Sequence, residues 1–168
     1  QTYDLRVNHP LTIDDTDVFL IGHGYAPVIT VRDGQGNVAA SGPMVFLPQD
    51  QSFLSFGVIK APSARPGQLG FDGLFYPTFD LADGDPVTVW PDDLDPLVSM
   101  QVYTGDLGLD DGRPQSVYLL DTDDAEQVTK ADGTPYRMDL RLGETETLPD
   151  GPNQIANTEL LILLRKLA

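Results

Sequence analysis

Cysteine is absent from this chain of 168 residues. Its absence excludes disulfide bonds, thiol nucleophiles and cysteine-ligated zinc sites, so cysteine usage says nothing about the redox compartment. Long hydrophobic runs are also missing: the longest extends from Leu160 to Leu164, whereas a membrane-spanning helix needs about 18 apolar residues or more. No signal-peptide pattern is found either. We therefore expect this sequence, as it stands, to be water-soluble.

Basic residues are scarce. The chain has 10 Lys and Arg residues against 26 Asp and Glu residues, which gives a formal net charge of −16 at pH 7. Nucleic-acid binding gains much of its affinity from cations that neutralise phosphates, and this negative field would repel phosphates and anionic lipid headgroups. We therefore expect no nucleic-acid partner and no anionic membrane surface as a partner. The acidity leaves two explanations open, a cationic or neutral partner and solubility alone.

The length and composition are those of one globular domain. Hydrophobic residues make up 40% of the chain and charged residues 21%, values that are typical of folded proteins rather than disordered ones. Glycine and proline cluster in stretches such as APSARPGQLG, which are typical of exposed loops. Because apolar segments continue on both sides of these loops, we expect one domain with one core.

Short segments rich in β-branched and aromatic residues alternate with turn signals. The pair Asp-Gly, which suits tight turns, begins at Asp33, Asp72, Asp83, Asp111, Asp132 and Asp150. No segment before residue 155 has helical periodicity over three turns. This pattern predicts an all-β fold, a β-sandwich or open barrel of short strands with long Pro/Gly-rich loops. The expected strands are residues 18–21, 28–31, 44–47, 53–59, 87–90, 98–103, 117–120 and 136–142.

The last of these segments alternates most clearly. One face of the expected strand carries Tyr136, Met138, Leu140 and Leu142, and the other carries Arg137, Asp139 and Arg141. The same reasoning, applied along the chain, predicts the core. We expect it to include Phe19, Ile21, Val45, Phe46, Phe56, Val58, Val102, Tyr118 and Leu140.

Motifs for common catalytic and nucleotide-binding chemistries are missing. None of the serines lies in a GxSxG context, and no Walker or dinucleotide-binding glycine pattern occurs. The acidic segments DLGLDDG and DTDDAEQ lack the ligand spacing, central glycine and terminal glutamate of a calcium loop. We therefore expect no catalytic residues and no metal site, and we predict that the chain is not an enzyme.

Four stretches of the chain carry a resemblance to a known family. They are VNHPLTIDDTDVFLIGHGYAPVITVRDGQGNV from Val7, SGPMVFLPQDQSFLSFGVIKAP from Ser41, GQLGFDGLFYPTF from Gly67 and YTGDLGLDDGRPQSVYLLD from Tyr103. Together they resemble the extracytoplasmic domain of ResB, the membrane subunit of the System II machinery for cytochrome c biogenesis, and most closely its actinobacterial members. The resemblance extends from Tyr3 to Gly151.

The resemblance implies a part of a larger, membrane-embedded protein. In this family, transmembrane helices flank the domain, and the protein works with a partner, ResC, to move haem across the membrane and attach it to apocytochrome c. We therefore expect residues 1–151 to form a ResB-like β domain on the extracytoplasmic face of the cell membrane. The isolated domain would hold no cofactor, because the parent complex handles the haem. Residues 152–168 match nothing in the family, and we expect a divergent or vector-encoded tail.

The two histidines of the chain, His9 and His23, are candidate ligands. His23 stands between glycines in IGHGYAP, and neutral imidazole is an axial ligand of haem iron; a structural bulge or turn is the alternative. His9 precedes a proline, which favours extended backbone. A mixed metal site would combine it with Asp14, Asp15 and Asp17, although turn carboxylates are the simpler interpretation. The resemblance places the haem-ligating histidines of the family in membrane-embedded parts, so we expect mainly structural roles for both.

Three functions remain in view. We predict a non-enzymatic domain of a complex for haem delivery and cytochrome c assembly, which docks a ResC-like partner or apocytochrome c. The first alternative is a domain that itself binds haem through His23 or His9. The second is an extracellular adhesion or carbohydrate-binding module, which would need Phe75, Tyr76 and Trp90 as an exposed, flat platform.

Overall fold

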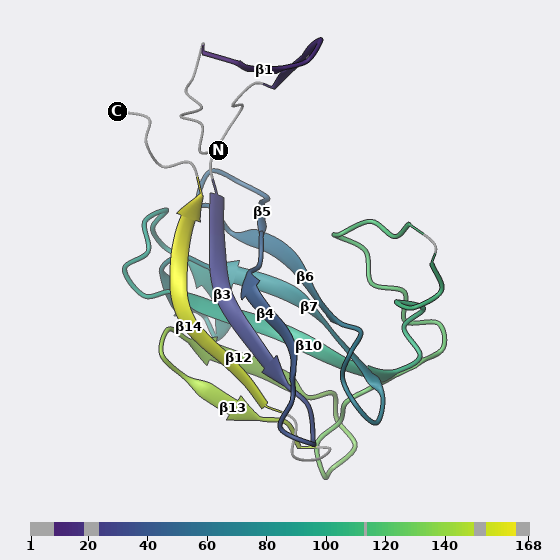
Figure 1. The fold of residues 1–168 in the computed structure, drawn as a ribbon. Coiled ribbons are helices and arrows are strands. Elements are labelled where there is room, and N and C mark those ends of the chain that lie inside the picture. Colours follow the sequence, from purple (N-terminus) through teal and green to yellow (C-terminus); the bar gives the residue numbers. More distant parts are fainter. Residues whose placement is uncertain (1–8, 19–23, 113, 150–153, 164–168) are drawn as a thin grey trace.

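A computed structural model of the chain describes residues 9–18, 24–112, 114–149 and 154–163. This part of the chain forms fourteen β-strands and no helix, so it contains no helix that could cross a membrane. Two antiparallel sheets lie face to face, as Figure 1 shows, and two hairpins stand apart from them. The expected all-β, sandwich-like fold is confirmed.

The smaller sheet has four strands and the larger sheet has six. The smaller sheet has the order β13 (Thr145–Thr147), β14 (Gln154–Leu163), β3 (Gly24–Arg32) and β4 (Val38–Pro43). The larger sheet has the order β11 (Ala125–Gln127), β10 (Leu97–Gly105), β7 (Gln68–Tyr76), β6 (Ser55–Ala61) and β5 (Leu47–Pro48), and β12 (Arg137–Arg141) pairs with β10 beside β11. The separate hairpins are β1 (Leu11–Ile13) with β2 (Thr16–Val18) and β8 (Phe79–Ala82) with β9 (Asp85–Thr88).

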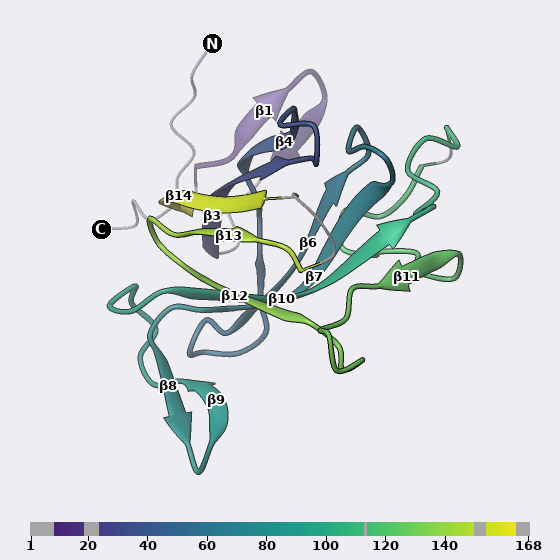
Figure 2. The same ribbon diagram turned by 90° about the horizontal axis from the view of Figure 1, so that it is seen from below.

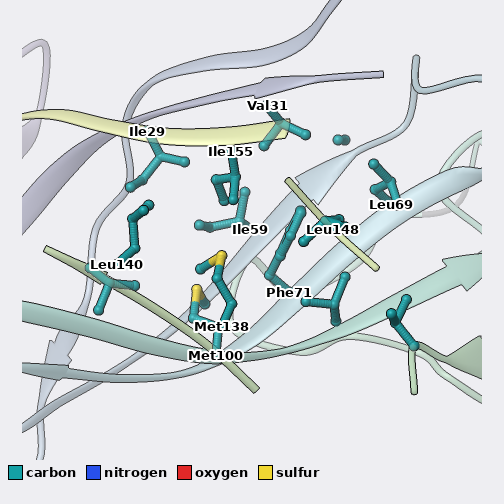
Figure 3. Close-up of a cluster of buried hydrophobic side chains, with 14 of the residues drawn as sticks. Ile29, Val31, Ile59, Leu69, Phe71, Met100, Met138, Leu140, Leu148 and Ile155 are labelled. Carbon is teal, nitrogen blue, oxygen red and sulfur yellow. The ribbon is translucent and has the colours of Figure 1, made fainter. Parts of the chain in front are cut away.

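Side chains from both sheets fill the space between them (Figure 3). Ile29 and Val31 of β3 are completely buried, and so are Met100 of β10 and Leu140 of β12. Complete burial of an apolar side chain of this size contributes about 1.5–3 kcal/mol. The core between the sheets is therefore the main source of stability. Other buried members of the same cluster are Ile59, Leu69, Phe71, Phe75, Val98, Val102, Met138, Leu148 and Ile155.

The chain passes between the sheets at both pairs of edges. After β4, residues 44–46 continue beside β3, where the N–H groups of Met44 and Phe46 donate to the carbonyl groups of Pro27 (2.9 Å) and Tyr25 (3.2 Å). β5 then pairs with β6 of the larger sheet. At the opposite edge, a turn leads from β12 in the larger sheet to β13 in the smaller one. These crossings close the sides of the sandwich and give it the character of an open barrel.

The observed core differs in part from the nine residues expected. The confirmed residues, each at most 1% exposed, are Phe46, Val102 and Leu140. The prediction is wrong for four residues, which are partly or largely exposed and lie outside the core cluster: Val45, Phe56, Val58 and Tyr118. The remaining two, Phe19 and Ile21, lie outside the described residues.

Strand β6 shows the physical reason for two of these errors. Three of its four inward positions carry small residues, Ser55, Gly57 and Ala61, and a Cβ at Gly57 would come within 2.6 Å of the Phe46 ring. Phe46, supplied by the crossing between the sheets, therefore occupies core space that a larger side chain of β6 would need. Because side chains alternate along a strand, Phe56 and Val58 lie on the opposite side, which we call the outer face of the larger sheet.

Four of the eight expected strands are found, but their boundaries differ. Residues 28–31, 53–59, 98–103 and 136–142 correspond to β3, β6, β10 and β12, whereas residues 117–120 form a turn and loop and residues 44–46 form the crossing. In the expected strand 18–21, Val18 lies in β2 and residues 19–21 are outside the described part. In the expected strand 87–90, only residues 87–88 lie in a strand, β9. Asp83 and Gly84 form the β8–β9 turn with φ values of 54° and 92°, as a type I′ turn requires. Asp72 and Gly73, expected at a turn, lie instead in the middle of β7.

The tail expected at residues 152–168 contains a strand. Residues 154–163 form β14, which lies between β3 and β13 in the smaller sheet, and Ile155 is completely buried in the core. This segment is therefore a structural part of the sandwich. The expected boundary after residue 151 and the origin of the tail stay predictions.

Candidate functional site

The outer face of the larger sheet presents ordered rows of side chains. Strand register aligns residues of β6, β7 and β10 across this face, and each row ends on β12 or β11. The central row is Val58, Asp72, Gln101 and Arg137. The rows on either side are Phe56, Leu74, Ser99 and Asp139, and Lys60, Gly70, Tyr103 and Gln127. The first two rows change from apolar at β6 to polar at β10 and β12.

The polar half of the outer face is held by hydrogen bonds between side chains. The Ser99 hydroxyl donates to Asp139 Oδ1 (2.5 Å) and accepts from Arg137 Nε (2.6 Å). Gln101 Oε1 accepts hydrogen bonds from the Tyr103 hydroxyl (2.8 Å) and from Gln127 Nε2 (3.1 Å). Since Ser99 is only 4% exposed, this network fixes the Arg137 side chain on the sheet.

Asp72 lies at the centre of the outer face. Burial raises the pKa of its carboxyl group above the usual value. Burial also raises the pKa of Tyr103, and the negative charge of Asp72 adds to that effect. A hollow of about 360 Å³ opens beside this carboxyl group, and its lining residues are Phe56, Asp72, Gly73, Leu74, Gln101 and Arg137. One acidic and one basic group across a small hollow suit a polar segment of a partner protein.

A second hollow, of about 340 Å³, lies at the apolar half of the outer face. Its lining residues are Pro43, Met44, Val45, Val58, Lys60, Val117 and Tyr118. The Lys60 ammonium group donates to Gln115 Oε1 (3.1 Å) and to the Ser116 carbonyl (2.9 Å), which ties the loop before β11 to β6. Val117 of this loop is 67% exposed. The two hollows together give the face adjacent polar and apolar sites, an arrangement typical of protein interfaces.

The comparison with family models decides the classification. The model of the ResB-like family matches residues 1–159. The chain belongs to the ResB-like family. The expected family is thereby confirmed, and with it a role in cytochrome c biogenesis and a place in a membrane complex. Searches of curated proteins and of solved structures gave no match.

His9, the histidine that the structure of this ResB-like chain describes, lines neither hollow. His9 is exposed, and His23 lies outside the described residues. Asp14, Asp15 and Asp17 are exposed as well. Among the described residues, no group of three or more His, Asp or Glu side chains is placed to hold a metal ion. The structure therefore does not assemble the mixed site that was considered for His9.

The aromatic platform needed for a carbohydrate-binding or adhesion module is not formed. Phe75 is completely buried and Tyr76 is 2% exposed, whereas Trp90 is 54% exposed. Phe75 packs against the Tyr25 ring at 5.1 Å between ring centroids, because it points into the sandwich from β7. A flat platform of all three rings is therefore excluded. The structure of this ResB-like domain thus does not support the carbohydrate-binding or adhesion function, which required that platform.

Sequence reasoning missed the residues that make up the polar half. Asp72 was assigned to a turn because it precedes glycine, although FDGLFY is an apolar run of strand type. Aromatic residues on both sides of the Asp-Gly pair were the signal against a turn. Arg137 and Asp139 were correctly placed on the face opposite to Met138 and Leu140. Their link to Ser99 depends on pairing between β10 and β12, which a single sequence does not give.

Proposed function

We propose that this domain is a non-enzymatic docking domain on the extracytoplasmic side of a ResB-containing complex. It would bind a ResC-like membrane partner or apocytochrome c while haem is delivered and attached. The family match over residues 1–159 carries this proposal. The outer face supports it, since exposed apolar and polar groups lie side by side there.

Haem is, in this proposal, the cargo of the parent complex and not a resident cofactor of the domain. The two hollows on the outer face are lined by carboxylate, guanidinium, amide and aliphatic groups. Among the residues that the structure describes, neither lining contains an imidazole, the usual protein ligand of haem iron in carriers. The residues of the outer face therefore fit a polypeptide partner better than a haem group.

Cytochrome assembly in cells tests the proposed function. The parent protein would carry Val117→Arg, which places a charge at the apolar hollow, and haem-stained c-type cytochromes would be quantified. Val38→Arg is the matched control, because Val38 is 50% exposed on β4 of the other sheet. We expect a loss of covalently bound haem with Val117→Arg and normal levels with Val38→Arg.

Two outcomes would contradict the proposal in different ways. Normal cytochrome levels after deletion of the whole domain would exclude a role for it in assembly. Normal levels with Val117→Arg, together with a loss after deletion, would leave the role intact and exclude the outer face as the docking surface. Immunoblots of the parent protein would show that each variant accumulates normally.

A further inference from the structure

The β8–β9 hairpin and the loop after it form an arm that projects from the sandwich (Figure 2). We call residues 77–96 the acidic arm. This segment contains six aspartates and no lysine or arginine. It lies away from both hollows on the outer face, whose lining residues all come from other segments.

Hydrogen bonds hold the acidic arm in one conformation. The Thr78 hydroxyl donates to the Asp92 carbonyl (2.6 Å), and the Thr78 carbonyl accepts from the Val89 N–H group (3.0 Å). Thr78 thereby draws the loop after β9 against the start of β8. At the base, the Arg141 guanidinium pairs with Asp95 and lies 5.6 Å from the centre of the Phe79 ring. The arm is therefore pre-organised and needs little ordering when it binds a partner.

Apolar side chains are concentrated on this arm. Leu81, Val89, Trp90 and Leu94 are between 54% and 73% exposed. They are four of the twelve exposed large apolar residues in the described part of the chain, although the arm is a small part of it. Single exposed apolar residues are ordinary, but four of them on one projecting segment that also carries six aspartates favour an interaction site.

The negative charge of the acidic arm favours a positively charged partner. Leu81 follows Asp80 directly, Leu94 stands between Asp93 and Asp95, and Asp92 lies two residues after Trp90. An anionic membrane surface would be repelled by this arm, and so would a second copy of a chain with a net charge of −16. A protein segment that combines apolar side chains with Lys or Arg satisfies both features at once.

We propose that the acidic arm is a docking element for a basic, amphipathic segment of a partner protein. Leu94, Trp90 and Leu81 would pack on the apolar side chains of that segment, and the aspartates of the β8–β9 turn, Asp83 and Asp85, would pair with its cations. The inference rests on the proposed docking function for its biological setting, and it names a second surface and the chemistry of the partner.

Trp90 allows a direct test, because it is the only tryptophan of the chain. The 168-residue chain would be titrated with a short amphipathic peptide of Leu and Lys, and Trp90 emission would be recorded. We expect a saturable blue shift that weakens with added salt. The counterpart peptide of Leu and Glu should cause no shift, and neither should vesicles of zwitterionic phosphatidylcholine.

Matched variants separate docking on the arm from general attraction to an acidic protein. Leu94→Asn should weaken binding by about tenfold, because a buried leucine contact is lost at unchanged charge. Leu119→Asn, at a site that is 65% exposed on another loop, should leave the affinity unchanged. Asp83→Asn combined with Asp85→Asn at the arm's turn should weaken binding several-fold more than Asp14→Asn combined with Asp15→Asn at the other hairpin.

Several outcomes would overturn the inference. Peptide binding without a change in Trp90 emission would place the site elsewhere, and equal effects of Leu94→Asn and Leu119→Asn would do the same. A blue shift with phosphatidylcholine vesicles would identify a lipid surface as the occupant. None of these results bears on cytochrome assembly after deletion of the domain, so failure of this inference is distinguishable from failure of the proposed function.

Discussion

The ring of Phe46 lies against the backbone of Gly57, with only 2.6 Å between the ring and the place where a Cβ of residue 57 would stand. Phe46 comes from the crossing between the sheets, and Gly57 lies in the middle of β6. This contact packs the crossing between the sheets against the inner face of β6, while Phe56 and Val58, the neighbours of Gly57 in β6, lie on the outer face.

The first prediction concerns this pair. Gly57→Ala should lower the free energy of unfolding by about 1–3 kcal/mol, because the added methyl group overpacks the core against Phe46. Denaturation by urea, followed by circular dichroism, would measure the change. In the double variant with Phe46→Leu, the smaller side chain makes room for the methyl group, so the combined loss should be less than the sum of the single losses. Additive losses would show that the two residues are not in contact.

Asp72 should make the folded chain less stable at neutral pH. Burial raises the pKa of its carboxyl group, so the folded chain binds this proton more tightly than the unfolded chain does. Burying the charged carboxylate lowers the free energy of unfolding. This loss is absent at a pH below 3.8, the ordinary pKa of Asp, and it develops as the pH rises through the higher pKa of the folded state. Asp72→Asn should therefore raise the melting temperature at pH 7 and have little effect below pH 3.8. A lower melting temperature at pH 7 would contradict this prediction.

Asp33 should show the opposite dependence on pH. Burial acts to raise the pKa of Asp33, but hydrogen bonds from the N–H groups of Asn37 and Gln35, 2.9 Å each, hold this pKa below the ordinary value. The ionised Asp33 carboxylate therefore stabilises the folded chain. This stabilisation is complete at a pH above 3.8, the ordinary pKa of Asp, and is lost as the pH falls through the lower pKa of the folded state. Asp33→Ala should therefore destabilise the chain at pH 7, with a smaller difference in acid. Urea denaturation over this pH range would measure it, and a constant difference would exclude the charge as its origin.

The net charge of −16 should accelerate docking of a cationic partner. Added salt shortens the Debye length from about 30 Å at 0.01 M to about 8 Å at 0.15 M, so the association rate should fall over this range. Stopped-flow mixing of the chain with its partner would measure the rate. A rate that is flat across the range would leave acidity as a feature of solubility alone.

The chain should not form a one-to-one, histidine-ligated complex with haem. Haemin titration, followed in the Soret band, should show no sharp low-spin shift that saturates at one haem per chain. His9 is exposed, and it precedes a proline that favours extended backbone. A saturating shift that disappears in His9→Ala or His23→Ala would reverse the assignment and favour a domain that binds haem itself.

The sequence by itself determined the β class, many of the turns and the family. Alternation along residues 136–142 placed Met138 and Leu140 inward and Arg137 and Asp139 outward, as the structure confirms. Leu142, expected on the inward face, is 48% exposed, because β12 ends at Arg141. Asp83 with Gly84 forms the expected tight turn, because both residues adopt positive φ values there. These features are local, since the pleat of a strand and the dihedral angles of a turn depend on a few neighbouring residues.

Only the tertiary structure decided which face of β6 is buried and which residues meet on the outer face. An alternating strand has two faces, and the choice between them depends on what packs against each one. Phe46 comes from the crossing before β5 and packs over Gly57 on the inner side, whereas Val58 lies on the outer face. Likewise, Asp72, Gln101 and Arg137 share a row only because β7, β10 and β12 pair in this register. Such pairings join residues far apart in the chain, so no local pattern could specify them.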